Sequence, residues 1–158
     1  MRSRRYQFLN FGILSELLNV VSVWFNDYNE DVLNEITIPN TIVNHDSQAT
    51  ETRFFSGDWG SLESKYFTKL FKDESDKFDL ILTSETIYNQ ENQSKLVSIF
   101  RQFLKQEGKV LVAGKTFYFG VGGGMRQFEK IVQDSGLKSE LVKSYDTGVK
   151  REILKIQL

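Results

Sequence analysis

The chain has 158 residues, of which 40% are apolar and 26% charged, and its formal net charge is −1. This length fits a single domain, residues 1–158, and the near-zero charge gives no long-range attraction to nucleic acid. The absence of cysteine excludes disulfides, and with His45 as the only histidine a histidine-based metal site is also excluded. No apolar run reaches the about 18 residues that span a bilayer, and the first residues do not resemble a signal peptide. We therefore expect no membrane association and a cytoplasmic or nuclear location.

The first part of the chain is expected to alternate helix and strand. Apolar residues recur at near-helical spacing over residues 8–19, which predicts a helix, and residues 20–25 predict a buried strand. Asn29 is a suitable cap for a short helix that Pro39 would end. Residues 41–43 have the composition of a short strand.

The middle of the chain contains the clearest strand. Residues 45–53 are polar and predict a loop, and residues 64–71 predict a short helix. The sequence FDLILT, residues 78–83, is typical of a central strand. Asn89 is expected to cap the helix that follows, and residues 106–108 to form a turn. The apolar stripe of that helix consists of Leu96, Val97, Phe100, Phe103 and Leu104.

The last part of the chain continues the alternation. Residues 109–113 predict a buried strand, and a glycine-rich loop at residues 120–124 opens a helix. Residues 137–145 and 151–158 predict two late strands. The alternating apolar residues of the last segment favour an antiparallel strand at the edge of the sheet. Together these patterns predict an α/β fold with a largely parallel sheet.

Ligands of open α/β sheets bind beyond the carboxyl ends of the strands, and polar residues come after the apolar segments of this chain. Asp27 is placed to accept two hydrogen bonds from ribose hydroxyls, or it is a turn residue. Trp59 is able to stack on an adenine while Asp58 accepts from its exocyclic amine, or the two form a tight turn with a core tryptophan. Glu85 and Tyr88 share one face of a turn or helix start, and they mark the expected active site.

Residues 114–124 form an unusual connection, with four further glycines after Gly114 and three aromatic residues. One interpretation is a loop that grips a substrate. A phosphate-binding loop is a rival, but Met125-Arg126 stands where a P-loop has Lys followed by Ser or Thr. The spacing also differs from a dinucleotide-binding fingerprint, and a flexible connection is the remaining alternative.

Several motifs in order resemble the eukaryotic histidine protein methyltransferase 1 family of class I, seven-strand methyltransferases. They are Asp27-Tyr28-Asn29, FSGDW at residues 55–59, DLILTSETIYN at residues 79–89 and YFGVGGG at residues 118–124, besides Glu35, Pro39 and Asn40. The resemblance spans about residues 20–158. The pair Glu85 and Tyr88 also resembles the (D/E)-x-x-(Y/F) signature of related lysine-directed enzymes.

The resemblance implies a Rossmann-like, mostly parallel sheet with an antiparallel C-terminal edge, and S-adenosylmethionine as cofactor. Asp27 would hold the ribose, and Asp58 and Trp59 would flank the adenine. The methyl-transfer site would be lined by Thr83, Ser84, Glu85 and Tyr88. The pocket for the target side chain would be shaped by Asn89, Tyr118, Phe119, Gly120, Gly122 and Gly123. The family's known substrate is a histidine in a large-subunit ribosomal protein, so a protein substrate is implied.

One departure from this family concerns the start of the sheet. Class I enzymes begin with an apolar strand and a glycine-rich loop, and counting back from Asp27 places that loop near residues 5–12, where only Gly12 fits. We therefore expect the first strand to be missing or degenerate, the domain to look N-terminally truncated, and unpaired edges at the sheet's centre. The alternatives to an active histidine methyltransferase are a catalytically inactive fragment or degenerate paralogue that binds proteins, and a protein-lysine methyltransferase.

Overall fold

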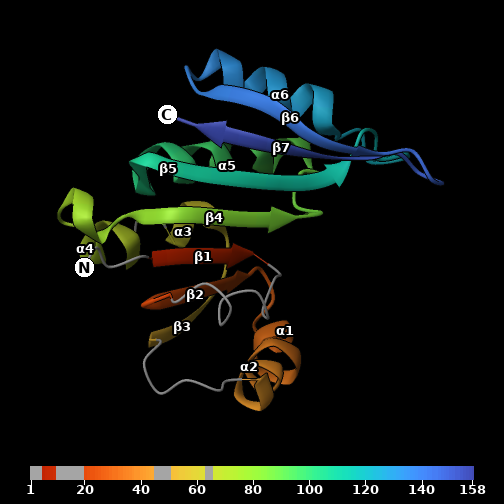
Figure 1. The fold of residues 1–158 in the computed structure, drawn as a ribbon. Coiled ribbons are helices and arrows are strands. Elements are labelled where there is room, and N and C mark those ends of the chain that lie inside the picture. The colour runs from red at the N-terminus through yellow and green to blue at the C-terminus, as the bar shows by residue number, and fades with distance from the viewer. Residues whose placement is uncertain (1–4, 10–19, 45–50, 63–65) are drawn as a thin grey trace.

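A computed structural model describes residues 5–9, 20–44, 51–62 and 66–158, with the backbone alone for the first of these ranges. Seven strands form one sheet in the order β3-β2-β1-β4-β5-β7-β6 (Figure 1). The strands are β1 Arg5–Leu9, β2 Ser22–Asp27, β3 Glu51–Ser56, β4 Phe78–Ser84, β5 Leu104–Lys115, β6 Lys138–Tyr145 and β7 Arg151–Gln157. Pairing is parallel from β3 to β5 and antiparallel at β5–β7 and β7–β6. The expected α/β class, with a mostly parallel sheet and an antiparallel C-terminal edge, is confirmed.

The expectation of a missing first strand is wrong, because β1 occupies the centre of the sheet. Tyr6 pairs with Val23 of β2 on one side and with Leu80 of β4 on the other. A sheet without this strand would leave the backbone groups of two neighbours unpaired, and a five-residue segment satisfies both edges. The helix expected over residues 8–19 is therefore wrong at its first two residues, and residues 10–19 lie outside the described residues.

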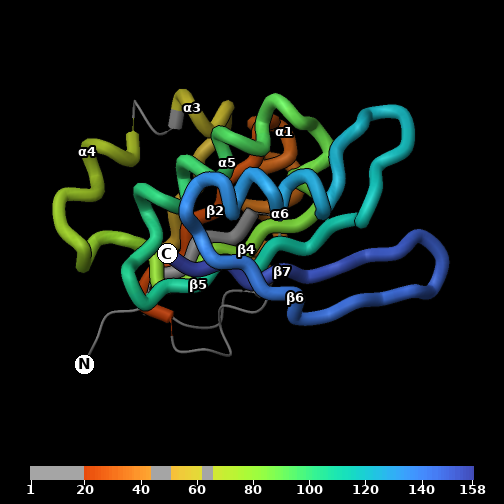
Figure 2. The backbone as a smooth tube through the Cα atoms, turned by 90° about the horizontal axis from the view of Figure 1, so that it is seen from above, coloured from red at the N-terminus to blue at the C-terminus, as the bar shows by residue number. Residues whose placement is uncertain are grey.

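Two longer helices, α5 Gln90–Phe103 and α6 Met125–Asp134, lie on the same face of the sheet (Figure 2). The predicted cap of α5 is confirmed, since the Asn89 side chain accepts a hydrogen bond from the Glu91 N–H at 2.9 Å. The remaining helical segments are short: α1 Glu30–Val32, a π-helical turn Leu33–Thr37, α2 Ile38–Asn44, α3 Trp59–Leu62, α4 Thr68–Leu70 and a 3-10 turn Glu74–Asp76.

The core has a larger and a smaller cluster, because alternate side chains of β2 point to opposite faces of the sheet. Trp24 belongs to the larger cluster, where its ring lies 5.2 Å from Phe71 and 5.3 Å from Phe78. Val23 and Phe25 belong to the smaller cluster. The larger cluster includes the buried residues of α5 and α6, so the sequence's apolar stripes are what attach these helices to the sheet.

Several local expectations differ from the structure. Residues 41–43 are helical and do not form the expected strand. Pro39 does not end the helical segment, because it is the second residue of α2 and follows a π-helical turn, where the hydrogen-bond pattern already changes. The expected loop at residues 45–53 is wrong from Glu51 onward, where β3 begins. Residues 106–108 lie within β5 and do not form a turn. The last strand, β7, was expected at the edge of the sheet, but the edge strand is β6. The alternation of apolar and polar residues in β7 arises because one face of the strand is covered.

Candidate functional site

A cleft of ≈ 180 Å³ opens at the carboxyl ends of β2, β3 and β4. Its lining includes Asn26, Asp27, Asp58, Trp59, Glu85 and Tyr88. The parallel pairing of these strands through β1 brings their carboxyl ends to one edge of the sheet. Five side chains singled out in the sequence, from three separate segments, thus surround one space.

Asp27 is the last residue of β2, and its Oδ1 accepts a hydrogen bond from the Asn29 N–H at 2.9 Å. This is an Asx turn, which orients the carboxylate at the strand end. From the described residues no hydrogen bond reaches Asp27 Oδ2. The carboxylate therefore keeps acceptor capacity for a ligand in the cleft.

Asn26 is a site residue that the sequence reasoning missed. Its side chain is buried, its Nδ2 donates to the Phe55 carbonyl at 2.9 Å, and its Oδ1 accepts from Trp59 Nε1 at 2.9 Å. The amide thus fixes β2, β3 and the Trp59 ring relative to one another. A polar residue at the end of an otherwise apolar strand was the available signal.

Asp58 is held by an ion pair and by backbone hydrogen bonds. Its Oδ1 accepts from the Gly60 N–H at 3.0 Å, and its Oδ2 pairs with Lys95 Nζ at 2.8 Å. The hydrogen bond from Lys95 lowers the pKa of Asp58, against the opposing effect of partial burial, and the Gly60 N–H adds to the lowering. Asp58 is therefore an anion at neutral pH, fixed beside Trp59.

Replacing Lys95 by methionine is expected to remove a stabilising contribution that exists only while Asp58 is ionised. The folded pKa of Asp58 lies below the unfolded value of about 3.9, so this contribution is present above that value and is lost as the pH falls through the folded pKa. Because the two side chains are 43% and 31% exposed, the loss is at most about 1 kcal/mol. The free energy of unfolding, measured in urea, should differ between variant and parent at neutral pH but not at low pH. An equal difference at both pH values would contradict this prediction.

Glu85 follows β4 in a strained backbone conformation, with φ of 56°. Its N–H donates to the Ala113 carbonyl of β5 at 2.9 Å, which keeps the residue against the sheet. The left-handed conformation costs a non-glycine residue about 1–2 kcal/mol. Such strain persists where the surroundings impose it and is concentrated at functional sites. Tyr88, half exposed, lines the same cleft from the following turn.

Three predicted site residues in and after β4 do not line this cleft, and neither do the five predicted residues of the glycine-rich segment. Thr83 is 1% exposed, and its Oγ1 lies 2.6 Å from Thr86 Oγ1. Ser84 lines a second pocket on the other side of Glu85. Asn89 caps α5. The structure therefore places these residues behind or beside the cleft, where they support the segment that carries Glu85 and Tyr88.

The glycine-rich segment forms a tight turn pinned to the same region. Tyr118 donates its N–H to the Gly123 carbonyl at 3.0 Å, and the Gly122 N–H donates to the Tyr118 carbonyl at 3.2 Å. Gly120 and Gly122 have φ of +83° and +80°, a conformation that favours glycine. The Gln90 side chain donates to the Gly122 carbonyl, a contact that the sequence did not indicate. Phe119, at the tip of the turn, is 82% exposed.

Tyr118 joins this turn to Glu85. Its hydroxyl accepts a hydrogen bond from the Lys115 N–H at 3.1 Å, and its ring centre lies 6.3 Å from that of Tyr88. Burial raises the pKa of Tyr118 to about 12, against the opposing hydrogen bond from Lys115, and the Glu85 carboxylate raises it further. The phenol is therefore protonated over the whole range in which the protein is expected to work.

A Tyr118→Phe variant is expected to be destabilised less by high pH than the parent protein. In the parent, the contribution of the phenol is complete below the unfolded pKa of about 10 and is lost as the pH rises through the folded value of about 12. Phenylalanine removes this dependence and keeps the ring. Urea midpoints at pH values on both sides of 10 should fall less steeply for the variant. An equally steep fall in both proteins would contradict the shifted pKa.

Among the residues that the structure describes, no three His, Cys, Asp or Glu side chains are grouped so as to hold a metal ion. No described helix is both long and apolar enough to cross a membrane. The described cleft is lined by carboxylates, amides, hydroxyls and aromatic rings.

Comparison with known proteins places the chain in a family. The family model described as lysine methyltransferase matches residues 11–118. Histidine protein methyltransferase 1 homologues from Dictyostelium discoideum and Mus musculus are 43% and 35% identical to it over 74% and 94% of the chain. The chain covers 35% and 48% of these relatives, so it spans about half their length or less.

A solved structure agrees with the fold. A SAM-dependent methyltransferase of Leishmania major superposes with a TM-score of 0.63 at 11% identity, over 98% of this chain and 65% of that one. At this identity the similarity shows the fold alone. The relatives confirm the resemblance to the histidine protein methyltransferase 1 family stated from the motifs. The chain therefore belongs to the lysine methyltransferase family, and within it resembles the histidine protein methyltransferase 1 homologues.

Proposed function

We propose that the chain acts as an S-adenosylmethionine-dependent protein-histidine N-methyltransferase. The observation that carries this proposal is the cleft at the carboxyl ends of β2, β3 and β4, where Asp27, Trp59 and Glu85 meet. The names of the curated relatives supply the histidine and the protein substrate, and the family and fold supply the cofactor class. The ribosomal identity of the substrate rests on the motif resemblance.

The described cleft suits the adenosine part of S-adenosylmethionine. Its ≈ 180 Å³ is smaller than the about 300–1,000 Å³ of a complete small-molecule pocket. Asp27 Oδ2 would accept from a ribose hydroxyl, and Trp59, fixed by Asn26, would offer an aromatic face to the adenine. Asp58 would share its ionised carboxylate between Lys95 and the adenine amine. We propose that the methionine part lies along the adjacent carboxyl end of β1.

The proposed reaction needs positioning more than acid–base strength. The cofactor supplies an electrophilic methyl group on its sulfonium. The imidazole of the target has a pKa of about 6.5, so its neutral form is abundant near neutral pH. Glu85 would accept the N–H of that ring, which directs the other nitrogen toward the methyl group, and would take the proton after transfer. Tyr88 would hold the ring in line.

A lysine target is the second candidate, favoured by the family description and by the Glu85-x-x-Tyr88 pattern. A lysine amine has a pKa of about 10.4, so it must lose a proton before it attacks. That requirement makes a general base indispensable for lysine, whereas a histidine needs it mainly for orientation. The identity of the curated relatives favours histidine.

The function is tested by incubating the full chain with S-adenosylmethionine and a large-subunit ribosomal protein, then locating added methyl groups by mass spectrometry. We expect methylation of a histidine nitrogen. Methylation of lysine would establish the second candidate instead. Cofactor binding without any transfer, or partner binding without cofactor binding, would favour a protein-binding module. An Asp27→Ala variant serves as the control with a weakened cofactor site.

A further inference from the structure

A second pocket of ≈ 370 Å³ lies on the other side of Glu85 from the cleft. It is bounded by the carboxyl ends of β4 and β5 and by the start of β7. Its lining includes Ser84, Glu85, Lys115, Tyr145, Arg151 and Glu152. The proposed methyl transfer uses Glu85 and leaves the rest of this pocket without a role.

The charges around the second pocket are incompletely matched. Lys115 Nζ and Arg151 Nε approach the Glu85 carboxylate only to 3.9 and 3.8 Å, beyond the about 3.2 Å limit of a typical N–H···O hydrogen bond. Glu152, the other acid of the lining, is 3% exposed and is paired with Arg126 and Lys150. Two cations therefore face one carboxylate, and neither of them reaches it at hydrogen-bond distance.

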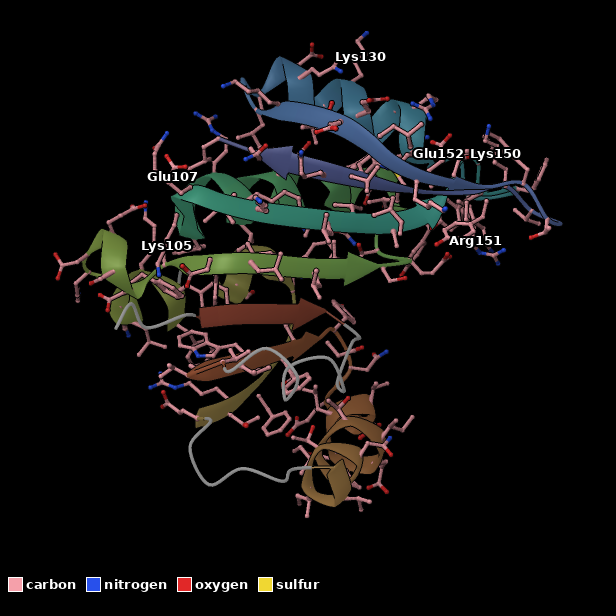
Figure 3. All side chains as sticks on the ribbon, viewed as in Figure 1. Lys105, Glu107, Lys130, Lys150, Arg151 and Glu152 are labelled. Carbon is pink, nitrogen blue, oxygen red and sulfur yellow. The ribbon has the colours of Figure 1, made fainter. Side chains whose placement is uncertain are left out.

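The positions of these charges can be followed in Figure 3, where Lys150, Arg151 and Glu152 lie together at the start of β7. Arg151 is half exposed, and its Nη1 donates to the Val149 carbonyl at 3.2 Å, which leaves further donors of the guanidinium for a ligand. Arginine binds carboxylates with two parallel hydrogen bonds when geometry allows. Two exposed aromatic residues lie nearby, Phe117 just after β5 and Tyr145 at the end of β6.

We propose that this second pocket binds an acidic side chain of the polypeptide substrate, close in sequence to the methylated residue. Lys115 and Arg151 are the side chains that would contact its carboxylate. Because Glu85 borders both spaces, a polypeptide whose target side chain reaches Glu85 has its flanking residues within reach of the second pocket. Naming a substrate side chain as the ligand rests on the proposed function, whereas the carboxylate preference rests on the two cations alone.

The carboxylate preference is tested by NMR on the full chain, without any methyl transfer. The probes are N-acetyl-glutamate N-methylamide and its glutamine counterpart, which differ only in charge. We expect the acidic probe to shift the amide signals of residues 113–115 and 151–153, and the neutral probe to leave them unchanged. Equal shifts, or no shifts with the acidic probe, would overturn the proposal.

Charge variants make the same test sharper. Arg151→Glu should abolish the shifts, and Lys115→Gln should weaken them without reversing any charge on β7. Lys130→Glu is the matched control, because Lys130 lies on α6 away from the pocket (Figure 3). Shifts that survive Arg151→Glu and Lys115→Gln alike would contradict the assignment of these cations.

A second arm asks whether the ligand is part of the substrate. A series of histidine peptides carries glutamate at one flanking position at a time. Each peptide is compared with its glutamine counterpart in binding affinity and in methylation rate. We expect the peptide with glutamate at one particular position to bind about tenfold more tightly than its glutamine counterpart, on the scale of one charge-assisted hydrogen bond. The Arg151→Glu variant should instead prefer the peptide with lysine at that position. Methylation that ignores the flanking charge would overturn the proposal and leave the proposed function intact. Absence of methylation with the NMR preference intact would overturn the proposed function, and with it the substrate side chain as ligand, and would leave the carboxylate preference of the pocket.

Discussion

A Glu85→Gln variant is expected to lower the rate of methyl transfer by about 10²-fold, the lower end of the usual contribution of a positioned acid–base group, because a histidine acceptor needs Glu85 mainly for orientation. Glutamine keeps the size of the side chain but cannot take the proton of the acceptor ring. The backbone at φ of 56° and the hydrogen bond to Ala113 depend on the main chain, so the segment keeps its shape. Single-turnover kinetics with saturating cofactor measure the effect directly.

The control for this prediction is Glu107→Gln, since Glu107 lies on β5 at the opposite end of the sheet from Arg151 (Figure 3). We expect it to leave the rate unchanged. Cofactor affinity should be similar in parent, variant and control, because Asp27, Asp58 and Trp59 are not altered. A Glu85→Gln enzyme as fast as the parent would remove Glu85 from the proposed mechanism.

The second large effect is expected from Gly123→Ala. A Cβ at this position would lie 2.3 Å from the Tyr88 carbonyl oxygen and 2.5 Å from that of Ile87. Both neighbours are backbone atoms, so the whole segment must move, and overpacking of this kind typically costs about 1–3 kcal/mol. For a domain of this size we expect Tm to fall by about 2–12 °C. Methyl transfer should fall about 10²-fold, because Tyr88 is displaced.

Gly120→Ala is the matched control in the same turn. Nothing lies within 4 Å of its added Cβ, so the cost is limited to the φ of +83°, about 1 kcal/mol. Its Tm should therefore fall clearly less than that of Gly123→Ala, and its rate should change little. Equal effects of the two substitutions would show that backbone strain, and not contact with Tyr88, makes this turn sensitive.

Much of the fold could be predicted because the relevant signals are local. The run at residues 78–83 is β4, the apolar stripe beginning at Leu96 is α5, and the two predicted late strands are β6 and β7. The turn expected at Gly108 failed because the glycine lies inside the long strand β5, where the pairing with β4 shifts register between Leu104 and Lys109. Such pairing between distant segments leaves no periodic trace in a single segment.

The first strand shows most clearly what local patterns leave out. Residues 5–9 alternate in a way that also suits a strand, but the spacing of Phe8 with later apolar residues favoured a helix. What decides the matter is the place between β2 and β4, where two rows of backbone groups need a partner. That requirement exists only in the assembled sheet, so the local pattern of residues 5–9 does not reveal it.

The candidate site was predictable where its residues stand at a strand end, as Asp27 does, or shortly after one, as Asp58 and Glu85 do. The contacts that orient these residues were not, because they join segments far apart in the sequence. Lys95 reaches Asp58 across 37 positions, and Gln90 reaches the Gly122 carbonyl across 32. Their amino-acid types are ordinary for a helix surface, so only the packing of α5 beside α3 and the glycine turn distinguishes them.

The proposed function requires that Asp27, Asp58 and Trp59 form part of a working cofactor site in this chain. Isothermal calorimetry with the folded 158-residue chain and S-adenosylmethionine tests it most directly. We predict saturable one-to-one binding that Asp27→Ala weakens at least about tenfold, the loss expected for a hydrogen bond to a charged acceptor. A folded chain that takes up no cofactor, or that binds it equally well without the Asp27 carboxylate, would contradict the account.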